Sequence, residues 1–152
     1  MSYKIPVQVS EVKLVYNSKV KPEDRPQIRK SQDAYWIFEA NWGDQIELLE
    51  TFNCLLLDRA NRVMAFCPIS KGGIVGTVVD LRLVFATALK ARATSIILAH
   101  NHPSGNLFPS NADIALTEKF KQAGDILDIP VLDHLILTPQ GKYYSFADEC
   151  KI

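Results

Sequence analysis

Hydrophobic and polar positions change their spacing several times along the chain, and each spacing predicts a different kind of element. Apolar runs, continuous or alternating, predict strands at residues 52–58, 63–69, 94–99, 129–137 and 143–146. Apolar residues at helical spacing predict helices at residues 32–42, 45–49, 80–92 and 110–123. Strands and helices alternate from about residue 50 onward, with at least one hairpin. The sequence therefore predicts an α/β layered domain whose mixed β-sheet is flanked by helices.

Residues at the ends and faces of the predicted helices make this prediction more specific. Ser31 is a typical N-cap for the helix at 32–42, and Gly124 is a typical C-cap for the helix at 110–123. The residues of this last helix that we expect to face the core are Ile114, Leu116 and Phe120.

The first thirty residues differ in pattern from the rest of the chain. Residues 4–16 alternate between apolar and polar side chains, which predicts a strand pair or one bent strand. Residues 17–30 are polar, partly basic and contain two prolines, as is typical of a connector. We therefore expect N-terminal strands and a connector over 1–30, followed by one domain over 31–152.

Charge and cysteine content narrow the functional classes. The 17 Lys and Arg residues balance the 17 Asp and Glu residues, so the chain lacks the positive charge typical of general nucleic-acid or membrane binding. No apolar run is long enough to span a membrane, and no secretory segment is evident. The three cysteines contain no C-x-x-C pair, which is typical of reduced, buried thiols in a cytoplasmic protein.

Two histidines at the end of an apolar run are the strongest chemical signal in the sequence. His100 and His102 follow the predicted strand at 94–99, and side chains two residues apart in an extended segment point the same way. A turn and the first residues of a helix then bring in Ser110 and Asp113. Two imidazoles and one carboxylate, with a position left for water, are the usual ligands of a catalytic zinc ion.

Several of these residues also have structural interpretations. Ser110 and Asp113 have the spacing of a capping box, which satisfies the first backbone N–H groups of a helix without any further function. His134 lies among apolar neighbours and is expected to be structural, with Asp133 holding its ring. A zinc-activated water also needs a general base.

For that base, spacing alone leaves Glu47 and Glu50 as equal candidates.

The full motif resembles a known family signature. His100-x-His102, seven residues, Ser110, two residues and Asp113 match the JAMM (MPN+) metalloprotease pattern. The surrounding strings 96–105 and 132–135 resemble its RadC-like branch, historically labelled DNA repair proteins, over roughly residues 45–150. This resemblance implies a cytidine-deaminase-like (JAB/MPN) fold built around one zinc ion. The N-terminal region does not resemble the helix-hairpin-helix DNA-binding module of longer RadC-like proteins.

The resemblance also implies a role for each residue of the motif. His100, His102 and Asp113 would be the zinc ligands, and Ser110 would stabilise the developing oxyanion. The family's catalytic glutamate precedes an apolar strand that contains a phenylalanine. The string Glu50-Thr51-Phe52 matches this, whereas Glu47 does not, so the resemblance favours Glu50. Gly76-Thr77 likewise matches a family turn before a helix.

The activity that the resemblance implies is zinc-dependent hydrolysis of an amide bond, by a peptidase or isopeptidase acting on an unidentified protein or peptide. The alternatives are a DNA-repair-associated protein, which the balanced charge does not favour, and an interaction protein without peptidase activity. A zinc deaminase is not expected, because the H-x-E and P-C-x-x-C motifs are absent.

Overall fold

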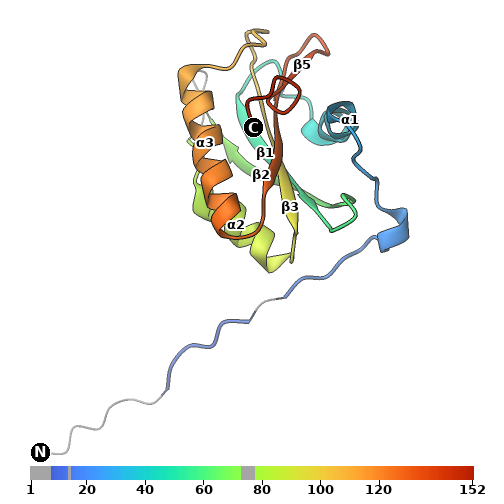
Figure 1. The fold of residues 1–152 in the computed structure, drawn as a ribbon, viewed down its shortest axis with the longest axis vertical. Helices are drawn as coiled ribbons and strands as arrows, with labels where there is room; N and C mark the ends of the chain where they lie inside the picture. The colour runs from blue at the N-terminus through green and yellow to red at the C-terminus, as the bar shows by residue number, and fades with distance from the viewer. Residues whose placement is uncertain (1–7, 14, 73–77) are drawn as a thin grey trace, which may run out of the picture.

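A five-stranded mixed sheet with helices on both faces forms the body of the protein (Figure 1). The structure is a computed structural model that describes residues 8–13, 15–72 and 78–152. Its helices are α1 (Ser31–Trp42), α2 (Leu81–Lys90) and α3 (Asn111–Ile126), with a short 3-10 helix, η1, at Pro22–Asp24. Its strands are β1 (Thr51–Leu57), β2 (Val63–Lys71), β3 (Ser95–Asn101), β4 (Val131–Leu137) and β5 (Tyr143–Ser145).

The strand order is β2-β1-β3-β4-β5, and β3 and β4 form the only parallel pair of neighbours among these strands. The predicted α/β domain with a mixed sheet is therefore confirmed. The crossover between β3 and β4 contains α3, as parallel neighbours require. The predicted ligands lie at the two ends of the loop that begins this crossover, with the histidines at the end of β3 and Asp113 in the first turn of α3.

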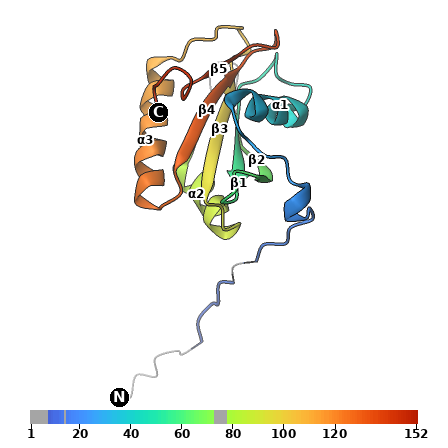
Figure 2. The same cartoon turned by 45° about the vertical axis from the view of Figure 1, so that its right-hand side comes forward.

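Two apolar clusters lie on opposite faces of the sheet. Residues of α2 and α3 pack on one face, and residues of α1 pack on the other (Figure 2). In β1, Phe52 and Cys54 point toward α2 and α3, whereas Leu55 and Leu57 point toward α1. Because both faces are covered, β1 and β3 read as near-continuous apolar runs in the sequence.

Helix α3 differs from its prediction in one inward residue and in its end. It continues past Gly124 to Ile126, so the predicted C-cap at Gly124 is wrong. A Cβ at Gly124 would lie 2.5 Å from the carbonyl oxygen of Ile129, which explains the glycine by close packing. Ile114 is 45% exposed rather than inward, whereas Phe120 is buried as predicted and Leu116 is half-buried.

Helix α1 begins at Ser31, so Ser31 is the first helical residue and Lys30 holds the cap position. The Asp33 carboxylate accepts hydrogen bonds from the backbone N–H groups of Arg29 and Lys30. The Ser31 hydroxyl instead donates to Asp148 at 2.6 Å. The predicted cap is therefore displaced by one residue, and the side chain of Asp33 replaces that of Ser31 as the hydrogen-bonding group.

Two further short elements are corrected by the structure. Residues 45–49 form a hydrogen-bonded turn rather than a helix. The predicted strands at 4–16 are absent from the described residues 8–13 and 15–16, and the remainder of that range lies outside the described residues. The predicted turn at Gly76-Thr77 also lies outside the described residues. Within the described ranges, no helix has the length and apolar character needed to cross a membrane.

Replacing Gly124 with alanine tests the close contact between α3 and the chain before β4. Alanine is favoured over glycine by about 1 kcal/mol in an unobstructed helix. We expect the reverse here, with Gly124→Ala lowering the free energy of unfolding by about 2 kcal/mol, because the new methyl group overlaps the Ile129 carbonyl. Urea unfolding measures this, with the exposed Lys119→Ala on the same helix as the control. Stabilisation by Gly124→Ala would contradict the packing.

Candidate metal centre

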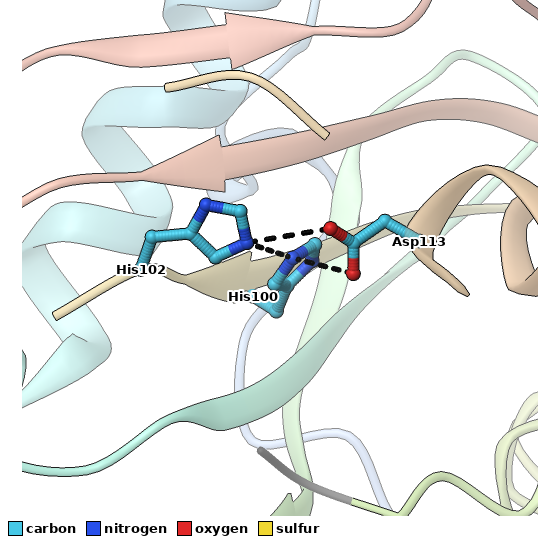
Figure 3. A group of neighbouring side chains, drawn as sticks. All are labelled: His100, His102 and Asp113. Carbon is cyan, nitrogen blue, oxygen red and sulfur yellow. Dashed lines mark hydrogen bonds and ion pairs between the residues drawn. The ribbon is translucent and has the colours of Figure 1, made fainter. Parts of the chain in front are cut away.

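His100 and His102 converge at the carboxyl end of β3 (Figure 3). His100 is 2% exposed, and His102 follows the last strand residue, with its backbone N–H donating to the carbonyl of Leu137. Their Nε2 atoms lie 3.0 Å apart. His102 Nδ1 lies 2.7 Å from the carbonyl oxygen of Asn106, which can only accept, so the proton is on Nδ1 and Nε2 is unprotonated in the neutral ring.

Asp113 completes this group from the first turn of α3. Its carboxylate oxygens lie 3.3 Å from His100 Nε2 and 3.4 Å from His102 Nε2. The predicted capping box is also present, because the Ser110 hydroxyl accepts from the Asp113 N–H and the Asp113 carboxylate accepts from the Ser110 N–H. The two interpretations of Ser110 and Asp113 are therefore compatible. The cap holds the carboxylate at the position where it meets both imidazoles.

The charges of the three side chains support one another. Burial raises the pKa of Asp113, but the close approach of the imidazoles of His100 and His102 outweighs this and holds the pKa well below its usual range. Burial lowers the pKa of His102, but the Asp113 carboxylate, the Asn106 carbonyl and the charge of Glu50 together outweigh this effect, and the net shift is upward. One atom from each side chain lies within 4.8 Å of the others. Two imidazole nitrogens and a carboxylate oxygen in this arrangement are suited to hold a divalent metal such as zinc.

A second layer of side chains supports His100 from behind. His134 is fully buried, and its Nε2 lies 2.8 Å from His100 Nδ1. Its Nδ1 lies 2.6 Å from the hydroxyl of Thr117, one turn after Asp113 in α3. Burial holds the pKa of His134 well below its ordinary value. Sequence reasoning placed His134 among structural residues and missed Thr117, although the spacing of four from Asp113 puts both on one helix face.

Asp133 does not hold the His134 ring, contrary to the prediction. Its carboxylate accepts from the backbone N–H groups of His134 and Ala147 and from the Ser145 hydroxyl. It therefore links β4 to β5 and to the following turn. The ring is oriented instead by His100 and Thr117.

Asn101, between the two histidines, points to the other side of β3 and fastens the segment before β1. Its Oδ1 accepts from the backbone N–H of Thr51 at 2.7 Å, and its Nδ2 donates to the carbonyls of Ile46 and Leu49 at 2.7 and 2.8 Å. Asn101 is fully buried. These bonds hold the segment with both candidate glutamates against the end of β3.

The strand register distinguishes Glu50 from Glu47. Phe52 pairs with His100 in the antiparallel β1–β3 ladder, so continuing that register by two residues brings Glu50 opposite His102. Glu50 is half-buried, whereas Glu47 is exposed. The charge of Glu50 also contributes to the upward shift in the pKa of His102. The register thus places Glu50 on the histidine side of the sheet edge.

Comparison with known proteins shows a family match over most of the chain. The family model described as the RadC-like JAB domain matches residues 28–151. The UPF0758 protein of Flavobacterium johnsoniae is 51% identical over 122 residues, which are 80% of this chain and 52% of that protein. The UPF0758 protein of Finegoldia magna is 51% identical over 90 residues, which are 59% of this chain and 40% of that protein.

The UPF0758 protein of Porphyromonas gingivalis is 43% identical over 95 residues, which are 62% of this chain and 42% of that protein. The chain thus spans about half, or less, of the length of these relatives. Their names specify no activity, substrate or partner.

Replacing Asn101 with leucine tests whether this residue fastens the segment that carries Glu50. The change leaves the Thr51 N–H and the carbonyls of Ile46 and Leu49 without their partner. We expect Asn101→Leu to lower the free energy of unfolding by about 3 kcal/mol. Native-state hydrogen exchange should also accelerate at the Thr51 amide.

The matched control is Asn41→Leu, because Asn41 is exposed and donates only within its own helix. Its effect should stay within about 0.5 kcal/mol. Equal effects of the two substitutions, or an unchanged Thr51 exchange rate, would contradict the role assigned to Asn101.

Proposed function

Because the chain belongs to the RadC-like JAB domain family, we propose that it is a zinc-dependent amide-bond hydrolase, a peptidase or isopeptidase acting on a protein or peptide. The observation that carries this proposal is the convergence of two histidines and one aspartate beside a partly buried glutamate. His100, His102 and Asp113 offer three ligands and leave a further position for water.

The three ligands fit a zinc ion by their chemistry. Neutral imidazole nitrogens and a carboxylate are preferred zinc ligands, and the low pKa of Asp113 keeps this carboxylate ionised at neutral pH. When bound, zinc would supply acidity to a coordinated water and polarise a substrate carbonyl. The nearly complete burial of His100 limits the direct access of bulk water to its ring.

Glu50 supplies the general base in this proposal. Its position opposite His102 lets its carboxylate accept the proton of the attacking water and later deliver that proton to the leaving amine nitrogen. A carboxylate in both roles conserves protons across the reaction, because the proton taken from the water is returned to the product amine. Asn101 assists by fastening the chain immediately before Thr51.

Ser110 supplies a hydrogen bond to the carbonyl oxygen as that oxygen becomes negative. As the N-cap of α3, its oxygen accepts from the Asp113 N–H at 3.1 Å, which leaves the hydroxyl hydrogen for another acceptor. The side chain is also exposed, as a group that meets substrate must be. The cap therefore holds the hydroxyl oxygen in place and leaves the hydroxyl hydrogen available for donation.

Paired glutamate variants test the proposed chemistry. We expect the zinc-loaded protein to cleave members of a proteome-derived peptide mixture, detected as new termini by mass spectrometry. Glu50→Gln should lower the cleavage rate by at least about 100-fold, because an amide cannot accept the proton. Glu47→Gln, a change of the same kind three residues earlier, should leave the rate unchanged. Both variants should retain zinc.

Two results would contradict the hydrolase proposal. One is a Glu50→Gln variant as active as the wild-type protein, which would remove the general base. The other is a wild-type protein that binds zinc and cleaves no peptide and no isopeptide-linked substrate. That second result would favour the interaction protein without peptidase activity.

A further inference from the structure

The buried histidine behind the metal centre has a more specific role than packing. We propose that Thr117 and His134 form a hydrogen-bond relay that fixes the proton of His100 on Nδ1, so that its Nε2 is presented to the metal unprotonated. His134 and Thr117 are then positioning residues. This inference rests on the proposed metal site but not on the hydrolysis of any substrate.

The direction of the relay follows from the hydroxyl of Thr117. That hydroxyl has one hydrogen, and its oxygen lies 2.7 Å from the backbone carbonyl of Asp113, which can only accept. The hydrogen is therefore used in that bond. The same oxygen lies 2.6 Å from His134 Nδ1, and the remaining possibility is that Nδ1–H donates to it.

The proton position then passes from one ring to the next. His134 is fully buried between aromatic rings, with Phe146 stacked on it at 5.0 Å, and such surroundings favour a neutral imidazole. A neutral ring with a proton on Nδ1 has an unprotonated Nε2. That Nε2 lies 2.8 Å from His100 Nδ1, so His100 must donate from Nδ1. Its other nitrogen, Nε2, is left as the ligand atom.

The reverse order of donors would disable the site. If the Thr117 hydroxyl donated to His134 Nδ1, then His134 Nε2–H would donate to His100 Nδ1. His100 would then carry its proton on Nε2, where it would block the metal. The relay begins at the Asp113 carbonyl, so one turn of α3 supplies one ligand and sets the proton of another. His102 needs no relay, because the Asn106 carbonyl serves it directly.

A nearly isosteric pair of variants isolates the hydroxyl of Thr117. Thr117→Val keeps the size of the side chain and removes the acceptor of His134 Nδ1–H, whereas Thr117→Ser keeps that acceptor. Thr87→Val is the matched control, because the Thr87 hydroxyl makes the same bond to a carbonyl four residues earlier, at Leu83, but faces no histidine. All three variants can be compared with the wild-type chain at equal stability by adjusting temperature.

Two measurements test the relay. Long-range ¹⁵N–¹H NMR correlation of the metal-free, ¹⁵N-histidine-labelled protein reports which nitrogen of each ring is protonated. Chelator competition reports zinc affinity. In the wild-type, Thr117→Ser and Thr87→Val proteins, we expect protons on Nδ1 of both His134 and His100. In Thr117→Val, we expect a substantial population of His100 with its proton on Nε2 and zinc affinity lower by about 10- to 100-fold.

The relay is overturned if wild-type His134 carries its proton on Nε2, or if Thr117→Val keeps both the wild-type proton positions and the wild-type zinc affinity. An equal loss of affinity in Thr87→Val would also overturn it, because helix destabilisation would then explain the effect. Failure of the wild-type protein to bind zinc would instead reject the proposed metal site. The NMR result would still decide the proton positions.

Discussion

The antiparallel pairing of β1 with β3 sets Phe52 opposite His100, and the arrangement of the candidate site follows from that register. A shift of one residue would turn Glu50 to the other face of the sheet, away from His102, because side chains alternate along a strand. The buried amide of Asn101 opposes such a shift, since its hydrogen bonds to Thr51 and Leu49 exist in one register only. A residue between two ligand positions thus positions the chain that carries the proposed base.

Helix α3 adds the second constraint. Its inward face combines the apolar Phe120 with the polar Asp113 and Thr117, and both polar side chains contact histidines of the sheet. Buried polar groups reduce stability unless each has a partner. Here each has one, because Asp113 contacts His100 and Thr117 contacts His134. Gly124 allows the chain to return closely against the helix before entering β4.

The sequence predicts the architecture and the three candidate ligand positions because these depend on local periodicity. Residues 96–99 are apolar because both faces of the sheet are covered, and His100 and His102 share a face because strands alternate. One inward residue of α3 is not predicted, because hydrophobic periodicity favours Ile114 over Thr117 on the buried face. The side chain that is buried there is polar and is satisfied by a histidine from a distant strand.

Other features depend on partners that no local pattern specifies. The bonds of Asn101 end on backbone atoms about 50 residues earlier, and backbone atoms carry no sequence signal. The register of β1 against β3 and the burial of the side chains distinguish Glu50 from Glu47, and spacing within one segment determines neither. A glycine near the end of a helical pattern is typical of a C-cap, and only the approach of Ile129 reveals the actual role of Gly124.

The zinc content of the purified protein, measured by elemental mass spectrometry, decides whether His100, His102 and Asp113 hold a metal ion. The purified protein, supplied with zinc and then dialysed, should retain one zinc ion per chain. Asp113→Ala should lose it, while Asp125→Ala, an exposed aspartate on the same helix, should retain it. A folded wild-type protein without bound zinc, or an Asp113→Ala variant that keeps it, would contradict the account.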